Sequence, residues 1–332
     1  MTSSFTRSLV AVSSVALVLA GCSDEPTPAA DAGIDAPRAD VQVTPDVQTP
    51  TDVQTATGDG PQPVTINFGA AVGAMPFRCG DRYMVGTPAA QADVVDLRFY
   101  VHDVRMVRAD GTEAPVALTA SAWQHEGVAL IDFENGAGAC DQGDAETNTA
   151  LVGTVAPGAY VGLRFKVGVP FAMNHVDLTS LPSPLNRSSL FWSWNSGHIF
   201  FAATTRAAAT RPVTLDGGLA DAAAPGDLGS VMVMNDHFTH VGSTGCMGSP
   251  ATGTPVTSCA KPNRPEIAFA AFDPSRQRVV VDLAVVKAGV DVTANAGCHS
   301  SVPACTPSFR ALGLDWATGA ADAATQTAFR VE

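Results

Sequence analysis

The stretch Val161-Gly162-Leu163-Arg164-Phe165-Lys166-Val167-Gly168-Val169 alternates apolar residues with glycines and charged residues. Successive side chains of a strand point to opposite faces, so this period of two places every apolar side chain on one face. The same alternation runs through residues 64–70 and 97–101. At Val104 and Met106 the apolar positions change parity, which a β-bulge near residues 102–103 would produce. The alternation predicts half-buried β-strands.

Turn signals separate these strands from one another. Asp110-Gly111, Asn135-Gly136 and Pro157-Gly158 are dipeptides typical of turns, and no convincing amphipathic helix of three turns is found. The fold class is therefore predicted to be all-β, an antiparallel sandwich or barrel-like single domain. Further strands are expected at 127–133, 198–204, 229–234, 265–272 and 278–287, and a surface loop at 215–227.

Residues 1–22 are expected to be a lipoprotein signal peptide. A short apolar run ends in Leu19-Ala20-Gly21-Cys22, and it is too short to remain in a bilayer as a span. A cysteine after Leu-Ala-Gly resembles the bacterial lipobox, in which Cys22 is lipidated and becomes the first mature residue. Ser23 after the cysteine favours the outer membrane under lipoprotein sorting rules. We therefore expect an outer-membrane lipid anchor, on the periplasmic or cell-surface side.

Residues 23–62 are expected to be a disordered tether. They are rich in proline, threonine, alanine and aspartate and contain no aromatic residue, so they cannot bury enough apolar surface to offset the entropy of ordering. Residues 63–332 then form one β domain. The full chain is 46% hydrophobic and 15% charged, with a formal net charge of -13. This charge excludes a nucleic-acid partner, because phosphates require a basic surface.

The cysteines support an oxidising compartment. The chain has seven cysteines. Without Cys22, which is expected to be lipidated, six remain, an even number that suits disulfides. Their spacing suggests Cys246 with Cys259 and Cys298 with Cys305, and Cys79 and Cys140 would then pair across a longer loop. Six cysteines allow many other pairings, so the spacing alone does not prove this one.

Two tryptophans, Trp192 and Trp194, are expected on the same side of one strand. Histidines and methionines, the borderline and soft ligands that suit copper, occur on both sides of them in the chain: His175, His198, His237, His240 and Met173. The alternative interpretation is that both indoles fill a β-core. Three more histidines are expected to have no metal role: His102 bonding locally within a strand, and His125 and His299 in loops.

Two other chemistries are weaker. The acidic residues of 132–146 offer hard oxygen ligands for calcium, but their spacing does not match an EF-hand loop. A solvated loop held by a disulfide fits this segment better. For a hydrolase, no Gly-x-Ser-x-Gly elbow is present and no Ser, His and acid group stands out. The chain is not expected to be an enzyme.

Several motifs in order resemble those of one family. They are residues 98–105 (RFYVHDVR), 130–136 (LIDFENG) leading to Cys140 and 146–148 (ETN), 162–175 (GLRFKVGVPFAMNH), 183–186 (SPLN), 191–194 (FWSW) and 240–246 (HVGSTGC). Together they are similar to the MbnP-like proteins, four-cysteine proteins that are partners of MauG-type di-haem peroxidases. The resemblance covers nearly all of 63–290. The family cysteines would correspond to Cys79, Cys140, Cys246 and Cys259, with Cys298 and Cys305 as an addition.

The resemblance implies a protein that binds one copper ion as Cu(I) and whose Trp192 is oxidised to kynurenine by the di-haem enzyme. Kynurenine carries an aryl amine, whereas indole offers only an N–H donor. The expected ligands are this modified residue with His175, His240 and His198, and Trp194 and Met173 would lie next to them. The function expected is copper homeostasis. The alternative is an adhesion or carbohydrate-binding sandwich in which the tryptophans stack on sugar.

Overall fold

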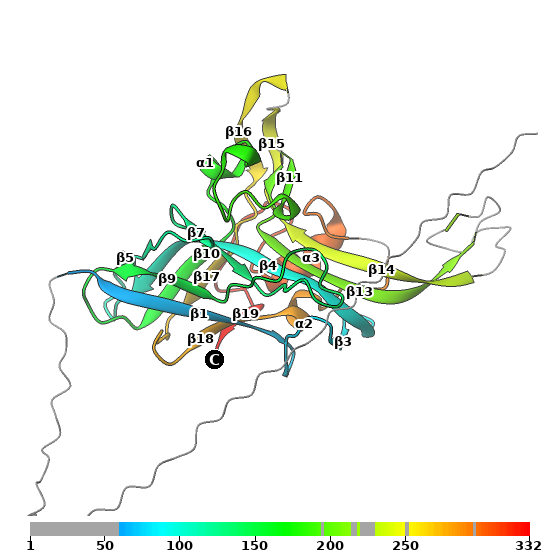
Figure 1. Ribbon diagram of the computed structural model, residues 1–332, viewed down its shortest axis with the longest axis horizontal. Helices are drawn as coiled ribbons and strands as arrows, with labels where there is room; N and C mark the ends of the chain where they lie inside the picture. Colours follow the sequence, from blue (N-terminus) through cyan, green and yellow to red (C-terminus); the bar gives the residue numbers. More distant parts are fainter. Residues whose placement is uncertain (1–59, 194–195, 214–217, 220–229, 250–251, 295–296) are drawn as a thin grey trace, which may run out of the picture. The chain divides into compact units, whose positions relative to one another are not determined.

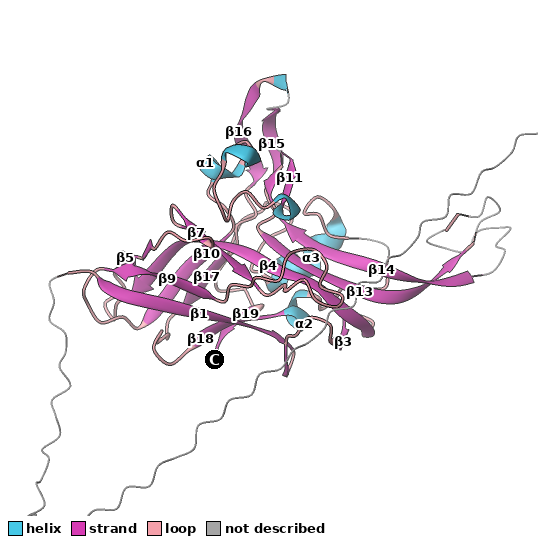
Figure 2. Cartoon of the chain, in the orientation of Figure 1, coloured by secondary structure: helices cyan, strands magenta, loops and turns pink. Residues whose placement is uncertain are grey.

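The computed structural model describes residues 60–193, 196–213, 218–219, 230–249, 252–294 and 297–332. Strands dominate these residues, as Figure 2 shows. The expected signal peptide with Cys22, nearly all of the expected tether, Trp194 and most of the loop expected at 215–227 lie outside the described residues. The first strand begins at Gln62, one residue before the expected start of the domain.

The larger sheet has nine strands with the order β14-β13-β4-β10-β17 along its path. Its longest strand, β4, pairs with β13, β10, β8, β3 and β5, always antiparallel. The strands are β3 (Arg82–Val85), β4 (Ala90–Val107), β5 (Glu113–Pro115), β7 (Gln124–His125), β8 (Val128–Asp132), β10 (Gly162–Val167), β13 (Phe201–Pro212), β14 (Ser230–Val241) and β17 (Glu266–Phe269).

The smaller sheet has six strands, with the order β19-β18-β1-β9-β6 and β2 paired to β1. Its β1–β18 pair is parallel, a departure from the antiparallel expectation; its other pairs are antiparallel. The strands are β1 (Gln62–Val72), β2 (Met75–Pro76), β6 (Ala117–Leu118), β9 (Ala150–Val155), β18 (Arg278–Asp282) and β19 (Phe329–Val331).

Two short hairpins lie outside both sheets. One pairs β11 (Phe191–Ser193) with β12 (Gly197–His198), and the other pairs β15 (Thr244–Ser249) with β16 (Thr254–Lys261). The β15–β16 hairpin projects at the top of Figure 1, next to α1. These hairpins flank the site described below.

The described helices are short: α1 (Phe171–Asn174), α2 (Leu283–Val286) and α3 (Thr306–Ala311), with three-residue 3-10 turns at 178–180, 188–190 and 303–305. None is long and apolar enough to cross a membrane. The strand expected at 278–287 is wrong beyond Asp282. The carboxylate of Asp282 accepts a hydrogen bond from the Ala284 N–H, which caps α2 and ends the strand.

The main core lies between the two sheets and is built on aromatic contacts. Phe68 of β1 packs edge-on against Phe99 of β4 and Phe165 of β10, with ring centroids 6.0 and 5.8 Å apart. Phe329 of β19 packs against Phe99 at 5.4 Å. Because these rings come from both sheets and meet between them, the all-β sandwich prediction is confirmed.

A second hydrophobic cluster covers the opposite face of the larger sheet. It contains Tyr100 of β4, Leu130 of β8 and Phe200, all fully buried, and Trp192 packs against it. Residues 94–102 of β4 are therefore buried on both faces, with no break in their burial pattern. A register shift between β4 and β10 spans Asp103, whose φ is 52°, so the bulge predicted at 102–103 is present.

Three disulfides join Cys79 to Cys140, Cys246 to Cys259 and Cys298 to Cys305, as the spacing suggested. The first joins the segment after β2 to the loop after β8. The second bridges β15 and β16 at directly opposite positions. The third closes a short loop before α3.

Candidate functional site

The segment 297–300 runs beside the end of β14 as a short parallel strand. The Cys298 N–H donates to the Phe238 carbonyl at 2.8 Å, and the His240 N–H donates to the Cys298 carbonyl at 2.7 Å. The Cys298–Cys305 disulfide ties this segment to the turn that begins α3. The pairing brings His299 next to His240.

Four aromatic rings therefore meet at the end of the larger sheet. The ring centroids of His240 and His299 lie 5.2 Å apart, with an angle of 72° between the planes. Phe238 lies against both imidazoles, at 5.1 Å from His240 and 5.4 Å from His299. The Trp192 ring meets His299 edge-on at 6.2 Å. We call Trp192, His240 and His299 the two-histidine site.

Trp192 is held by the β11–β12 hairpin and by a glycine of the 240–246 motif. The tryptophan is half-buried against the second cluster. A Cβ at Gly242 would lie 2.6 Å from Cζ3 of the Trp192 ring, so only glycine allows this approach. Ser300 fixes the turn, because its hydroxyl donates to the His240 carbonyl and accepts from the Gly242 N–H, both at 2.9 Å.

Desolvation favours the neutral form of both imidazoles, strongly at His240 and less at the exposed His299. Desolvation, then the neighbouring His299 and Lys287, lower the pKa of His240 to about 3, and desolvation lowers the pKa of His299. The His240 Nε2 atom lies 3.5 Å from the Thr204 hydroxyl, whereas Nδ1 is buried with no hydrogen-bond partner among the described residues. A buried nitrogen without a partner, on a neutral ring, is suited to a metal ligand.

A cavity of about 390 Å³ gives access to the site. It is lined by Trp192, His299, Ser196, Ser243, Thr244, Gly245, Cys246 and Ser301. Trp192 and His299 both face it, so a small ion or reactant reaches them from solvent. The cavity is large for a single ion alone and has room for side-chain adjustment.

A buried cation lies behind β14. Lys287, at the end of α2, is fully buried and its ammonium donates to the Ala203 carbonyl, the His237 carbonyl and the Thr239 hydroxyl at 2.9–3.0 Å. Desolvation lowers its pKa to about 7. His237 is buried beside this lysine, with Nδ1 3.3 Å from Nζ.

The structure does not bring His198 into the two-histidine site. Its ring is fully buried, with Nε2 2.9 Å from the Leu185 carbonyl and Nδ1 3.3 Å from the Asn174 carbonyl. It packs edge-on against Tyr100 and Phe191. This environment corrects the expectation of a copper ligand, because backbone carbonyls occupy both ring nitrogens of His198.

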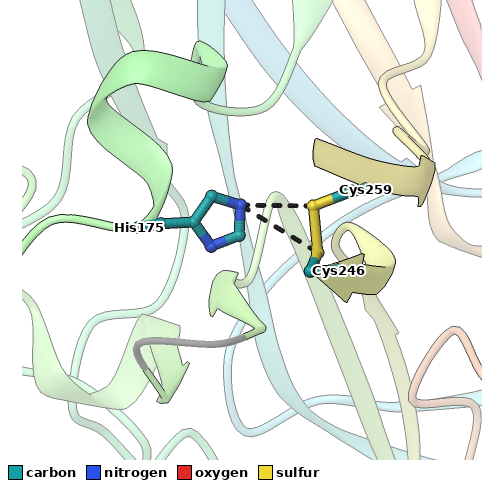
Figure 3. A group of neighbouring side chains, drawn as sticks. All are labelled: His175, Cys246 and Cys259. Carbon is teal, nitrogen blue, oxygen red and sulfur yellow. Dashed lines mark hydrogen bonds between the residues drawn. A yellow bond between two sulfur atoms is a disulfide. The ribbon is translucent and has the colours of Figure 1, made fainter. Parts of the chain in front are cut away.

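His175 also lies in a different place, against the β15–β16 hairpin. Its Nε2 atom is 3.3 Å from the Cys259 sulfur and 4.0 Å from the Cys246 sulfur, as Figure 3 shows. Met173 packs against the second cluster, which Trp192 also contacts. Of the expected set, Trp192 and His240 therefore lie in one place, each beside His299, whereas His175 and His198 lie elsewhere.

The acidic segment forms no calcium site. Asp141 pairs with Arg206 and Asp144 with Arg187, while Asp132 and Glu134 turn inward beside Arg98. Within the described ranges, the cluster of His, Cys, Asp or Glu close enough to hold a metal is His175 with Cys246 and Cys259, and it contains no carboxylate. The solvated loop remains the better interpretation of the exposed acids.

His299 was missed because its segment has no strand pattern. The residues around it, Gly297-Cys298-His299-Ser300-Ser301, read as a polar loop. The sequence contained one signal for it. His299 directly follows Cys298, whose disulfide partner is close in the chain, so the disulfide holds this histidine in place. In the same way, His240 begins the motif that ends at the disulfide-bonded Cys246. His102 was expected to bond locally, yet its Nε2 is buried without a hydrogen-bond partner among the described residues.

Comparisons with known proteins identify the family of this chain. The family model of MbnP matches residues 61–300, a range that includes Trp192, His240 and His299. Among solved structures, MbnP from Methylosinus trichosporium is similar, with a TM-score of 0.65 and 30% sequence identity over 82% of this chain and 98% of that chain. No curated protein matches the chain. With a family match over most of its length and a solved relative of the same fold, this chain belongs to the MbnP family.

Proposed function

We propose that this protein holds one copper ion, as Cu(I), at the two-histidine site. The observation that carries the proposal is the buried Nδ1 atom of His240, which has no hydrogen-bond partner in the described structure and lies on a neutral ring beside His299. Neutral imidazoles bind Cu(I) well, and low coordination numbers suit this ion. Phe238 packs on both rings, with its centroid 5.1 Å from that of His240 and 5.4 Å from that of His299.

Trp192 would supply the third ligand after oxidation. An unmodified indole carries an N–H donor and no lone pair for a metal. Oxidative opening of the five-membered ring, with loss of one ring carbon as formate, leaves kynurenine with an aryl amine and a ketone. The half-buried ring that faces the cavity beside His299 supports this assignment, because the new amine would form next to an imidazole.

The catalyst is proposed to be a di-haem peroxidase of the MauG type, with two equivalents of hydrogen peroxide as the oxidant and water for the release of formate. The protein would then be the substrate of a redox enzyme and not itself an enzyme. Lipidation at Cys22 would anchor it to the outer membrane, with residues 23–62 as a tether and the three disulfides suited to that oxidising space. The role proposed for the loaded protein is copper homeostasis.

The test is coexpression with the di-haem enzyme, followed by mass spectrometry of the Trp192 peptide and metal analysis. The expected result is exchange of one carbon for one oxygen at Trp192 and one bound copper per chain. The Trp192→Phe variant, expressed in the same way, controls for copper bound elsewhere. Intact Trp192 in the presence of active enzyme, with copper absent and glycan bound, would replace this proposal with the carbohydrate-binding alternative.

A further inference from the structure

We propose that His175, Cys246 and Cys259 form a second, redox-gated site for one soft metal ion. The site is closed while the two cysteines are bonded to each other, and it opens when a dithiol reduces them. Its biological ion would be Cu(I). It does not rest on the function proposed for Trp192, because it shares none of the residues of the two-histidine site.

The donor atoms already lie at nearly the right separations. The His175 Nε2 atom is 3.3 Å from the Cys259 sulfur and 4.0 Å from the Cys246 sulfur (Figure 3). In a tetrahedral site with ordinary metal–nitrogen and metal–sulfur bonds, a nitrogen and a sulfur ligand lie about 3.6 Å apart. The two measured distances bracket that value. Only the two sulfur atoms must separate, to about 3.8 Å, when the disulfide opens.

The histidine is held toward the sulfurs by its neighbours. His175 follows α1, and the side-chain amide of Asn174 lies 3.1 Å from its Nε2 atom. An amide N–H that donates to Nε2 marks this nitrogen, which faces the disulfide, as the unprotonated one. The same lone pair would bind the metal, so the ion would displace the amide N–H. Asn174 is itself buried, and its Oδ1 accepts from the His198 N–H at 2.8 Å. The amide is therefore fixed, and it orients the imidazole before any metal arrives.

The hairpin allows the disulfide to open without loss of the core. Cys246 and Cys259 face each other in the register of β15 and β16, which form their own two-stranded sheet. Neither cysteine belongs to the two hydrophobic clusters, whereas Cys140, Cys298 and Cys305 are buried in the main core. All three proposed ligands are partly exposed, so a reductant and a metal ion reach them.

The chemistry balances with a dithiol as reductant. The disulfide takes two electrons and two protons from the dithiol, which becomes a disulfide, and two thiols are formed. Binding of one Cu(I) by both thiols then releases two protons, because thiolates are the ligands. Thiolates with one imidazole are a soft donor set, which favours Cu(I) over harder ions.

The position of this site suggests its use. Cys246 also lines the cavity that Trp192 and His299 face. An ion released from the hairpin when the disulfide reforms would therefore enter that cavity directly. The hairpin site would take up copper after reduction by a dithiol. It would release the ion when a disulfide-bonded oxidant takes two electrons from the two thiolates, re-forms the Cys246–Cys259 bond and is itself reduced to two thiols.

The experiment reduces the purified chain with a dithiol under argon, removes the dithiol, and titrates it with Co²⁺ as a spectroscopic probe. Expected is one Co²⁺ bound with thiolate-to-cobalt charge-transfer absorption that the oxidised protein lacks. The Cys246→Ser/Cys259→Ser variant should lose this absorption. His175→Gln should weaken binding by about tenfold or more. The matched control is Cys79→Ser/Cys140→Ser. It removes a disulfide that is not part of the proposed site, so this variant should keep the absorption.

Site-resolved alkylation tests the same inference if reduction loosens the fold. With Zn²⁺ present, Cys246 and Cys259 should be protected from iodoacetamide in the reduced protein, while Cys79 and Cys140 should not. The proposal is overturned by equal alkylation of all cysteines, or by unchanged Co²⁺ affinity in His175→Gln. A Cu(I) titration then separates the two proposals. The increment on reduction that is lost in Cys246→Ser/Cys259→Ser belongs to the hairpin, and the copper bound before reduction belongs to the two-histidine site.

Discussion

The imidazoles of His240 and His299 lie 5.2 Å apart although one ends a long strand and the other sits in a short disulfide-closed loop. Their closeness depends on the parallel pairing of Cys298 with Thr239. Because that pairing fixes the backbone at both histidines, the angle between the rings is set before any metal binds. The site is preorganised by main-chain hydrogen bonds more than by side-chain packing.

Removal of either imidazole should abolish tight copper binding. We expect His240→Ala and His299→Ala each to lower Cu(I) affinity by about tenfold or more, since even supporting groups of metal sites contribute that much. Competition with a chromophoric Cu(I) chelator measures the affinity. His125→Ala is the matched control, because His125 contacts Glu126 at another position and its loss should leave the affinity unchanged. Equal affinities in all three variants would remove the two-histidine site from consideration.

A methyl group at Gly242 should displace Trp192. Gly242→Ala places a Cβ where the Trp192 ring now lies, so the hairpin β11–β12 must move. We expect slower kynurenine formation and weaker copper binding, with a cooperative unfolding transition retained. Peptide mass spectrometry after coexpression measures the modification. Gly60→Ala is the control, since no atom lies within 4 Å of a Cβ at that position. An unchanged yield of kynurenine in Gly242→Ala would contradict the assigned ring position.

Loss of the Cys298–Cys305 disulfide should affect both stability and the site. The short loop that it closes predicts a stabilisation of about 2–3 kcal/mol in the chain-entropy model. We expect Cys298→Ser/Cys305→Ser to unfold at lower urea concentration and to bind Cu(I) more weakly, because His299 is held by Cys298. Cys79→Ser/Cys140→Ser should lose stability but keep its copper affinity. The same affinity in both double variants would show that His299 needs no covalent support.

The pH dependence of stability should reveal Asp132. Burial, opposed in part by Arg98, raises its pKa to about 7, so between the unfolded value near 4 and pH 7 the folded chain holds a proton that the unfolded chain has lost. Its contribution to the free energy of unfolding therefore falls as pH rises from about 4 to about 7. Asp132→Asn should be more stable than the parent at pH 8 by roughly 2–4 kcal/mol, and nearly equal to it at pH 4.

Urea unfolding at both pH values measures this difference, and buried histidines contribute equally to both proteins. Glu126→Gln, an exposed change in a turn, controls for the loss of one negative charge. A difference between Asp132→Asn and its parent that does not vary with pH would show that Asp132 titrates normally.

Local patterns predicted most of the fold. The alternating residues 161–169 contain β10, and the change of parity at Val104 coincides with a β-bulge. The three disulfide pairs that the cysteine spacing suggested are all present. The parallel β1–β18 pair was not predictable, because alternation gives the faces of a strand but not the direction of its neighbour. The end of β18 depended on a cap at Asp282 within an otherwise apolar run.

The site was only half predictable for a similar reason. His240 and Trp192 lie in motifs, whereas His299 reaches them through a long-range strand pairing that leaves no periodic signal. His198 looked suitable because it follows the Trp-x-Trp motif closely, but position in the chain does not reveal that two backbone carbonyls occupy its ring. The sequence motifs therefore located the region around Trp192 and His240 but did not reveal that His299 lies beside them.

The larger sheet separates two hydrophobic layers, and this separation has a practical consequence. The main core between the sheets specifies the architecture, whereas the layer around Tyr100, Leu185 and Leu190 supports the hairpin that carries Trp192. The residues that support Trp192 are therefore largely separate from those that hold the two sheets together. Substitutions in the outer layer can therefore change the surroundings of Trp192 while the inner layer keeps the molecule folded, which gives selection two nearly independent variables.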